Sequence, residues 1–194
     1  TELIFTGQSN HAGTTPMRLR RDAGYAAGAM AAFVRDLVVD MGGEQVGTVG
    51  SLELEPNLVN VIARRARLTI DLRNTDQDLL GEAEARMMRK ARELAASEQL
   101  ELQTRQLARF APVDFHEPVI AAVERIASAM GHSARRMASG AGHDAQSFAP
   151  NCPTGMIFVP SVGGISHNVA EFTEAADIEA GANVLLNLVV ELAR

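Results

Sequence analysis

The stretch IARRARLTIDLRNTD, residues 62–76, decides how the first half of the chain is expected to fold. Up to Arg73, apolar and polar side chains alternate, which is the period of a β-strand with one buried face. The apolar face carries Ile62, Ala66, Leu68, Ile70 and Leu72, and the polar face carries Arg65, Arg67, Thr69, Asp71 and Arg73. Thr75 follows at once and is expected to cap a helix that runs to about Ser97.

The elements around this strand complete a small domain. Residues 2–6 are predicted to form a strand, and Thr15 is expected to cap a helix with Pro16 at its first position. Apolar residues recur at helical spacing from Leu19 to Leu37, and Gly42 or Gly43 is expected to end that helix. Strands are predicted at residues 46–54 and 100–107. The order β-α-β-β-α-β is that of a ferredoxin-like unit, an antiparallel four-stranded sheet with two helices on one face.

The second half of the chain alternates helices and strands after a predicted linker, FAPVD, at residues 110–114. Helices are predicted from Pro118 to Met130, over residues 145–149, and from Asp177 to Leu192. Strands are expected after residue 133 and at residues 154–160. Two or three strands do not make a sheet alone, so residues 110–194 are interpreted as the last part of a larger α/β domain. The fold class is therefore predicted to be α+β.

Composition excludes several classes of protein. The formal net charge of −6 argues against nucleic acid or an anionic membrane surface as a partner. No segment approaches the roughly 18 apolar residues of a membrane span. The single cysteine, Cys152, excludes an internal disulfide and fits a cytoplasmic protein. Because the chain opens inside a predicted strand, it is expected to be a fragment of a longer protein.

Three of the five histidines lie in loops rich in glycine or small polar residues. These loops are NHAGTTP around His11, SGAGHD at residues 139–144, and GGISHNVAE at residues 163–171. A single loop histidine is more often a surface group than a functional one, but three such loops in one chain favour a functional site. Imidazole binds Zn²⁺ and related metals and also donates hydrogen bonds to developing negative charge.

The stretches GQSNHAGTTPMRLRRDA, LELEPNLVNVI with LTIDLRNTD, SGAGHDAQSFA and PTGMIFVPSVGGISHNVAEFT follow one another along the chain. In this order they resemble the M20-type metal-dependent amidohydrolases. The most similar branch is that of the N-carbamoyl-L-amino acid hydrolases, β-ureidopropionases and allantoate amidohydrolases, often called hydantoinase/carbamoylase. The resemblance implies that residues 1–109 form a ferredoxin-like lid and dimerisation domain. It also implies that residues 110–194 form the C-terminal portion of an α/β metallohydrolase catalytic domain.

The resemblance assigns roles to three residues of the first half. His11 would be catalytic, donating a hydrogen bond in the partner subunit's site to the carbonyl oxygen as it becomes an oxyanion. Asn60 and Arg73 would bind substrate, and the Arg73 fork would hold a carboxylate.

In the second half, the resemblance gives Gly142 a backbone contact to substrate, with His143 and Asp144 in a supporting role. His167 would be the final metal ligand. The resemblance further implies a homodimer through the lid domain and two divalent ions, Zn or Mn, for which this chain supplies at most one ligand. The substrate would be a small molecule, an N-carbamoyl amino acid or a ureido acid such as allantoate.

Two alternatives remain open from the sequence. The first is an M20 peptidase or aminoacylase that cleaves peptide or N-acyl bonds. The second is a non-catalytic dimerisation or small-molecule-sensing module.

The spacing of Asn60 and Arg73 limits how both could contact one small substrate. They are thirteen positions apart, which in a fully extended chain is roughly 43 Å. On one straight strand they would also face opposite sides. If both serve one small substrate, Asn60 is expected in a reversing loop before the strand.

Overall fold

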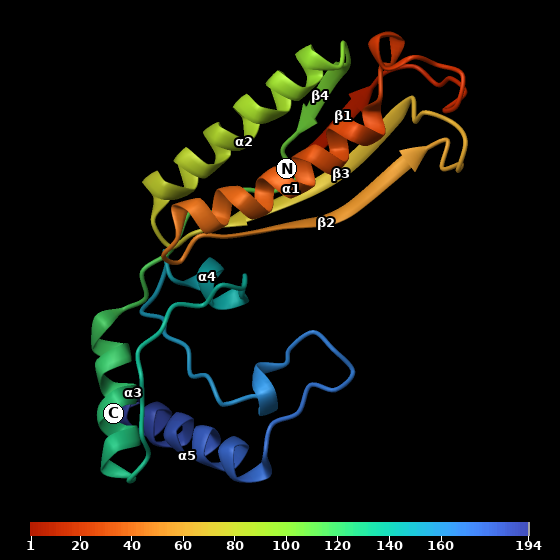
Figure 1. The fold of residues 1–194 in the computed structure, drawn as a ribbon. Coiled ribbons are helices and arrows are strands. Elements are labelled where there is room, and N and C mark those ends of the chain that lie inside the picture. Colours follow the sequence, from red (N-terminus) through yellow and green to blue (C-terminus); the bar gives the residue numbers. More distant parts are fainter. Residues whose placement is uncertain (194) are drawn as a thin grey trace. The chain divides into compact units, whose positions relative to one another are not determined.

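The computed structural model describes residues 1–193, which divide into two compact units (Figure 1). Unit 1 is Thr1–Pro112, and unit 2 begins at Val113. The division falls within residues 110–114, the stretch whose composition predicts a linker.

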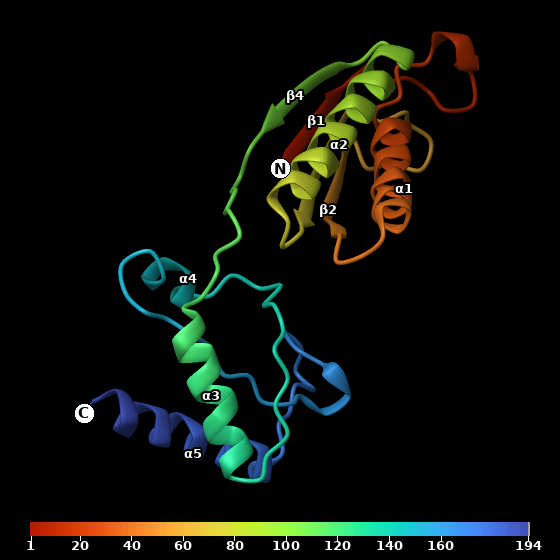
Figure 2. The same cartoon turned by 90° about the vertical axis from the view of Figure 1, so that its left-hand side faces the viewer.

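Unit 1 is a four-stranded antiparallel sheet with two long helices on one face (Figure 2). The strand order is β2-β3-β1-β4. The elements are β1 (Glu2–Thr6), a 3₁₀ turn η1 (Met17–Leu19), α1 (Ala23–Met41), β2 (Val46–Glu55), β3 (Arg65–Arg73), α2 (Gln77–Ser97) and β4 (Glu101–Arg105). The strand predicted from the alternating pattern is therefore confirmed as β3, with β1 and β2 beside it.

The core of unit 1 lies between the sheet and the two helices. On β1 and β3 alternate side chains point toward the helices, as the period of two requires. The buried set comprises Leu3, Phe5, Ala66, Leu68 and Ile70 from the strands, with Ala23, Ala26, Ala27, Met30, Val34, Leu37, Met87, Ala91, Leu94 and Ala95 from the helices. Leu19, expected in this set, is 59% exposed because it lies in η1 before α1 begins.

Both threonine caps predicted from the sequence are wrong. Asp22 caps α1, and its Oδ1 accepts a backbone N–H of the first turn at 3.0 Å. Asp76 caps α2, and its Oδ1 accepts two such groups at 2.8 and 3.0 Å. The hydroxyls of Thr15 and Thr75 are engaged elsewhere. The predicted glycine stop is confirmed, since Gly42 ends α1 with φ of 63°.

Strand β2 is one edge of the sheet and is the longest of the four strands. Of its ten residues only Glu53 and Glu55 carry charge, and both lie at its C-terminal end. The strand is largely exposed along its length. Among the described residues no strand pairs with its outer side.

Unit 2 is built on two packed helices, α3 (Glu117–Ala129) and α5 (Ala175–Leu192), with a short helix α4 (Asp144–Phe148) and a 3₁₀ turn η2 (Val162–Gly164). The apolar contact between α3 and α5 involves Val119, Ala122, Ile126, Ala127, Val184 and Leu188.

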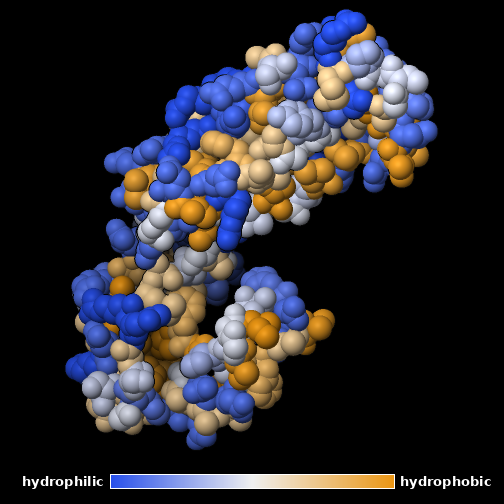
Figure 3. Space-filling model, viewed as in Figure 1, coloured by the Kyte–Doolittle hydropathy of each residue, from blue (hydrophilic) through white to orange (hydrophobic). Residues whose placement is uncertain are grey.

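The strands predicted after residue 133 and at residues 154–160 are not formed. Within the described part of unit 2 neither segment has a partner strand, and a lone segment makes no ladder hydrogen bonds. Large apolar side chains are correspondingly exposed on unit 2 (Figure 3). They include Phe158, Phe172, Leu185, Leu186 and Val189.

Across residues 1–193, no helix combines the length and the apolar character that crossing a membrane would need.

Candidate functional site

The loop before α1 and the loop between β2 and β3 lie side by side at one end of unit 1 (Figure 1). The Ala12 N–H donates to the Asn60 carbonyl at 2.9 Å, and the Ile62 N–H donates to the Asn10 carbonyl at 2.9 Å. These bonds flank His11 on both sides. The main chain at His11 is therefore held in place by the loop that carries Asn60.

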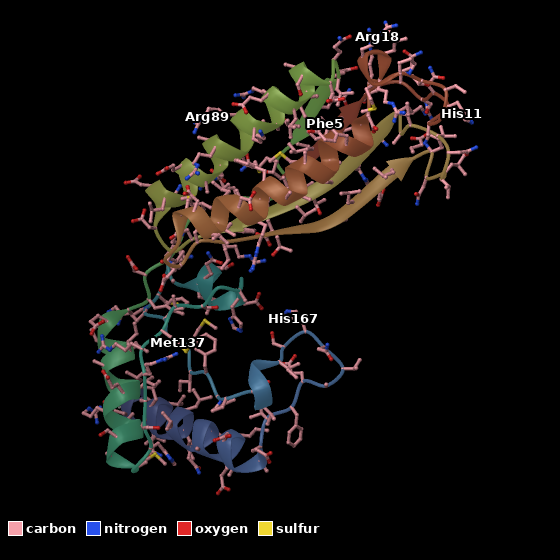
Figure 4. All side chains as sticks on the ribbon, viewed as in Figure 1. Phe5, His11, Arg18, Arg89, Met137 and His167 are labelled. Carbon is pink, nitrogen blue, oxygen red and sulfur yellow. The ribbon has the colours of Figure 1, made fainter. Side chains whose placement is uncertain are left out.

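The imidazole of His11 is tied back to its own loop. Its Nδ1 accepts the backbone N–H groups of Gly13 at 3.1 Å and Thr14 at 3.2 Å. A backbone N–H can only donate, so Nδ1 carries no proton, and in the neutral ring the proton lies on Nε2. The residue is exposed at the end of unit 1 (Figure 4). His11 is thus arranged as a hydrogen-bond donor through Nε2.

Two side chains support this loop from within. Thr15 is 7% exposed, and its hydroxyl donates to the His11 carbonyl at 2.7 Å. Arg20 donates from Nε to the Thr15 carbonyl at 3.0 Å and from Nη2 to the Ala12 carbonyl at 2.6 Å. The sequence did not indicate a role for Arg20, since nothing in its spacing distinguishes it from the arginines beside it.

Glycine at position 13 leaves room for the ring packed against it. A Cβ built there would lie 3.2 Å from Cε1 and 3.5 Å from Nδ1 of His11. The first of these is tighter than an ordinary van der Waals contact, so a larger residue would press on the imidazole.

Arg73 lies at the other end of β3 from Asn60. Its Nε is 3.1 Å from both carboxylate oxygens of Asp71, and its Nη2 is 2.6 Å from Oδ2. Both side chains are about half exposed. The hydrogen bonds from Arg73, reinforced by its charge, hold the pKa of Asp71 below its ordinary value. A substrate carboxylate would have to replace Asp71 on this guanidinium fork.

The predicted reversing loop is present, because residues 56–64 connect two antiparallel strands and Asn60 lies in it. The loop nevertheless leaves Asn60 beside His11, not beside Arg73. The nine residues of β3, Arg65–Arg73, span roughly 26 Å. Within one chain, His11 and Asn60 therefore lie together and Arg73 lies apart from both.

In unit 2 the SGAGHD loop leads into α4. His143 is the N-cap of that helix, and its Nδ1 accepts the Ala145 N–H at 3.0 Å. A Cβ at Gly142 would meet no atom within 4 Å, and its φ is not in the left-handed region. The fold of the described residues thus gives His143 a structural role and does not itself require glycine at position 142.

His167 occupies a strained position in the GGISHNVAE loop. Its φ of 56° is in the left-handed region, which is uncommon for a residue with a side chain. Its backbone N–H donates to Oε2 of Glu171 at 2.7 Å, and its Nδ1 lies 3.1 Å from the hydroxyl of Ser166. The residue is exposed (Figure 4). These contacts fix the ring's place in the loop.

The order of these loops along the chain agrees with a known family. The sequence profile of peptidase family M20/M25/M40 matches residues 6–191, which is almost the whole chain. The chain belongs to this family.

Curated relatives of this M20 chain include amidohydrolases. Allantoate amidohydrolase of Escherichia coli (strain K12) is 37% identical over 98% of this chain and 46% of its own length. N-carbamoyl-L-amino acid amidohydrolase of Geobacillus stearothermophilus is 38% identical over 100% of this chain and 47% of its own length. The M20 chain thus spans about half the length of the curated relatives it matches.

A solved structure with a similar fold is an amidase of the hydantoinase/carbamoylase family from Burkholderia vietnamiensis. It has a TM-score of 0.94 and 40% sequence identity, covering 98% of this M20 chain and 46% of the other. The mixed α/β fold of the M20 chain is therefore that of this group of amidases.

The described residues of the M20 chain do not by themselves fit a metal pair. Among residues 1–193, no group of three or more His, Cys, Asp or Glu side chains could hold a metal ion. His167 is a single imidazole, whereas a stable divalent site takes three or more protein ligands. Any metal centre that includes His167 would therefore need ligands from outside these residues.

Proposed function

We propose that this chain is part of a dinuclear-metal amidohydrolase that cleaves the ureido or amide C–N bond of N-carbamoyl amino acids or of allantoate. The family match and the amidohydrolase relatives support this class of reaction. The single observation that carries it is His11, whose Nδ1 accepts two backbone N–H groups. The neutral ring then has its proton on Nε2. A divalent metal pair would supply the activated water when the remaining ligands are present.

His11 is the group we assign to the reacting carbonyl. As the carbonyl carbon becomes tetrahedral, negative charge develops on its oxygen, and the Nε2–H donates to that oxygen. The bond between its main-chain carbonyl and the Ala12 N–H holds Asn60 next to His11, and the residue is exposed, so its side-chain amide could reach the same substrate. We assign Asn60 to substrate binding on this ground.

Arg73 is the group we assign to the substrate carboxylate. A guanidinium fork matches two carboxylate oxygens, and Arg73 already holds Asp71 in this manner. Because Arg73 lies roughly one strand length from His11 in the same protomer, a small substrate could not contact both residues of one chain. We therefore propose that His11 acts in trans, at a site that takes Arg73 from the partner.

This arrangement requires a homodimer, and we propose that unit 1 forms it as a ferredoxin-like lid and dimerisation domain over residues 1–109. The open edge of β2 supports this, because a long edge with little charge pairs readily with another strand. Residues 110–194 would then be the C-terminal portion of the catalytic domain. His167 would contribute one metal ligand there, and Gly142 a backbone contact to substrate.

A substrate panel on the full-length protein that contains this chain tests the proposal. We expect release of ammonia from N-carbamoyl-L-amino acids or allantoate, and loss of that activity after chelation of divalent metal. Turnover of dipeptides or N-acetyl amino acids in preference to ureido substrates would instead favour an M20 peptidase or aminoacylase. Absence of all hydrolysis with metal restored would favour a non-catalytic module.

A further inference from the structure

A series of hydrogen bonds runs from Arg20 to the imidazole of His11. Arg20 Nη2 donates to the carbonyl oxygen of Ala12 at 2.6 Å. That carbonyl belongs to the same peptide group as the Gly13 N–H, which donates to His11 Nδ1 at 3.1 Å. The guanidinium, the peptide and the imidazole thus form one chain of hydrogen bonds, each donating to the next.

This series of hydrogen bonds influences which nitrogen of the His11 ring carries the proton. A cation at a carbonyl oxygen draws electron density from the peptide, which makes the N–H of that peptide a stronger donor. A stronger bond into Nδ1 favours the tautomer with the proton on Nε2 and polarises that Nε2–H outward. The second bond of Arg20, from Nε to the Thr15 carbonyl at 3.0 Å, fixes the loop on its other side.

We propose that Arg20 is a positioning residue for His11, selecting its Nε2–H tautomer through the Ala12–Gly13 peptide. The catalytic use of that proton rests on the proposed function, but the choice of tautomer does not. Arg20 would not touch substrate. Its charge would act on the reaction only through the ring that it orients.

The test uses the chain itself with ¹⁵N-labelled histidine, at about pH 8.5, where an ordinary imidazole is neutral. Long-range ¹H–¹⁵N spectra report which ring nitrogen carries the proton, and the substitution His11→Gln assigns the signals. We expect Nδ1 of His11 to be unprotonated and Nε2 to carry the proton. In Arg20→Ala, we expect the Nδ1–H tautomer to gain population. The amide exchange of Gly13 and Thr14 should rise roughly 3- to 10-fold, the worth of one hydrogen bond.

The chain supplies matched controls. Arg18→Ala removes an equal charge from the exposed side of the same 3₁₀ turn and should change neither readout. His143 is an internal reference, because its Nδ1 also accepts a backbone N–H but has no link to Arg20. Its tautomer should stay constant in every variant. Arg20→Lys keeps the positive charge but lacks the two-nitrogen edge of the guanidinium. Its His11 signals should lie between those of the unsubstituted chain and those of Arg20→Ala.

Two results overturn the proposal. One is a His11 ring that carries its proton mainly on Nδ1 in the unsubstituted chain. The other is a folded Arg20→Ala chain in which the ring signals and both amide rates are unchanged. If Arg20→Ala does not fold, Arg20→Gln removes the charge and keeps a polar side chain. Unchanged ring signals and amide rates in that variant overturn the proposal in the same way. No substrate is involved, so failure of the proposed hydrolase activity would be seen separately.

Discussion

The proposed role of His11 is to donate one hydrogen bond to the substrate, and removing that bond should slow the reaction. In the full-length protein we expect His11→Ala to lower kcat by about 10²–10³, the usual loss for one oxyanion donor. The change in KM should be smaller, because the bond strengthens as charge develops on the substrate oxygen. Steady-state kinetics on an N-carbamoyl amino acid measure both constants.

The exposed His132, next to the end of α3, provides a control for the first prediction. His132→Ala removes an imidazole from a loop that has no part in the proposed site, and should leave kcat unchanged. An equal loss in both variants, or a His11→Ala enzyme with unchanged kcat, would contradict the assignment of His11.

The pKa of the Asp71 carboxyl depends on its contact with Arg73. Its pKa is lowered chiefly by the hydrogen bonds from Arg73, so Arg73→Ala should raise it toward the ordinary value of 3.8. The depressed pKa means that the pair stabilises the fold at neutral pH, and that this small contribution is lost as pH falls through and below that value. A carboxyl ¹³C titration of the chain measures the shift. Arg65→Ala, at the other end of β3, should leave the Asp71 titration in place.

The sequence pointed to some of these residues and missed others for a physical reason. His11 stands in a loop of glycine and small polar residues, which drew attention to it from residue type, whereas Asn60 was assigned only through the resemblance to a known family. Arg20 stands among other arginines, and its role depends on two carbonyls whose positions only the folded loop defines. The separation of Arg73 from His11 likewise follows from the direction of β3, which residue types do not encode.

At the scale of elements, the cap of α2 gives a direct comparison between sequence and structure. Asp76→Ala removes the acceptor of two backbone N–H groups and should lower the free energy of unfolding by about 1 kcal/mol. Thr75→Ala removes an exposed hydroxyl bound to Glu44 and should cost less than about 0.5 kcal/mol. Urea unfolding followed by circular dichroism measures both. A larger loss in Thr75→Ala would restore the cap that the sequence favoured.

Elements with their own periodic pattern were predicted well, and elements that need a neighbour were not. The alternation of residues 62–73 and the helical spacing of α1 and α2 are local properties. The structure confirms both helices and the strand over Arg65–Arg73, while residues 62–64 belong to the loop before it. The segment 154–160 is equally apolar, yet it forms no strand because a strand is defined by its partner. The cap of α2 failed by one position, since Thr75 and Asp76 are neighbours and both residue types favour an N-cap. The cap of α1 failed by more, because the 3₁₀ turn at Met17–Leu19 separates Thr15 from the true cap, Asp22.

At the scale of the whole molecule, the isolated chain should bind no metal pair and hydrolyse no ureido substrate. Its described residues contain no group of three or more potential ligands. Titration calorimetry with Zn²⁺ and Mn²⁺, and an ammonia assay with each metal added, measure these two properties. Turnover above that of a metal-only blank would disprove this expectation.

If His11 and Arg73 are divided between protomers as proposed, two inactive variants should complement each other. In a dimer of one His11→Ala chain and one Arg73→Ala chain, one site keeps both groups and the other has neither. Random mixing makes half of the dimers hybrid, so the mixture should recover about a quarter of the unsubstituted activity.

The two full-length variants are unfolded and refolded together, and activity is then assayed. The result distinguishes a site shared between protomers from a site within one protomer. If both residues served the site of their own protomer, no hybrid site would be intact and the mixture would stay inactive. The two variants refolded separately and then combined without exchange of subunits are the control.

If unit 1 dimerises as proposed, the open edge of β2 also matters before two chains have met. Seven consecutive residues, 46–52, carry no charge to deter pairing, and both glutamates lie beyond them. A newly made protomer therefore exposes a template that any extended segment can join, and correct assembly competes with aggregation for the same hydrogen bonds. Under the proposed dimer, expression yield should depend on how quickly two chains meet. A lysine introduced at Thr48 or Leu52 should then raise solubility and weaken assembly.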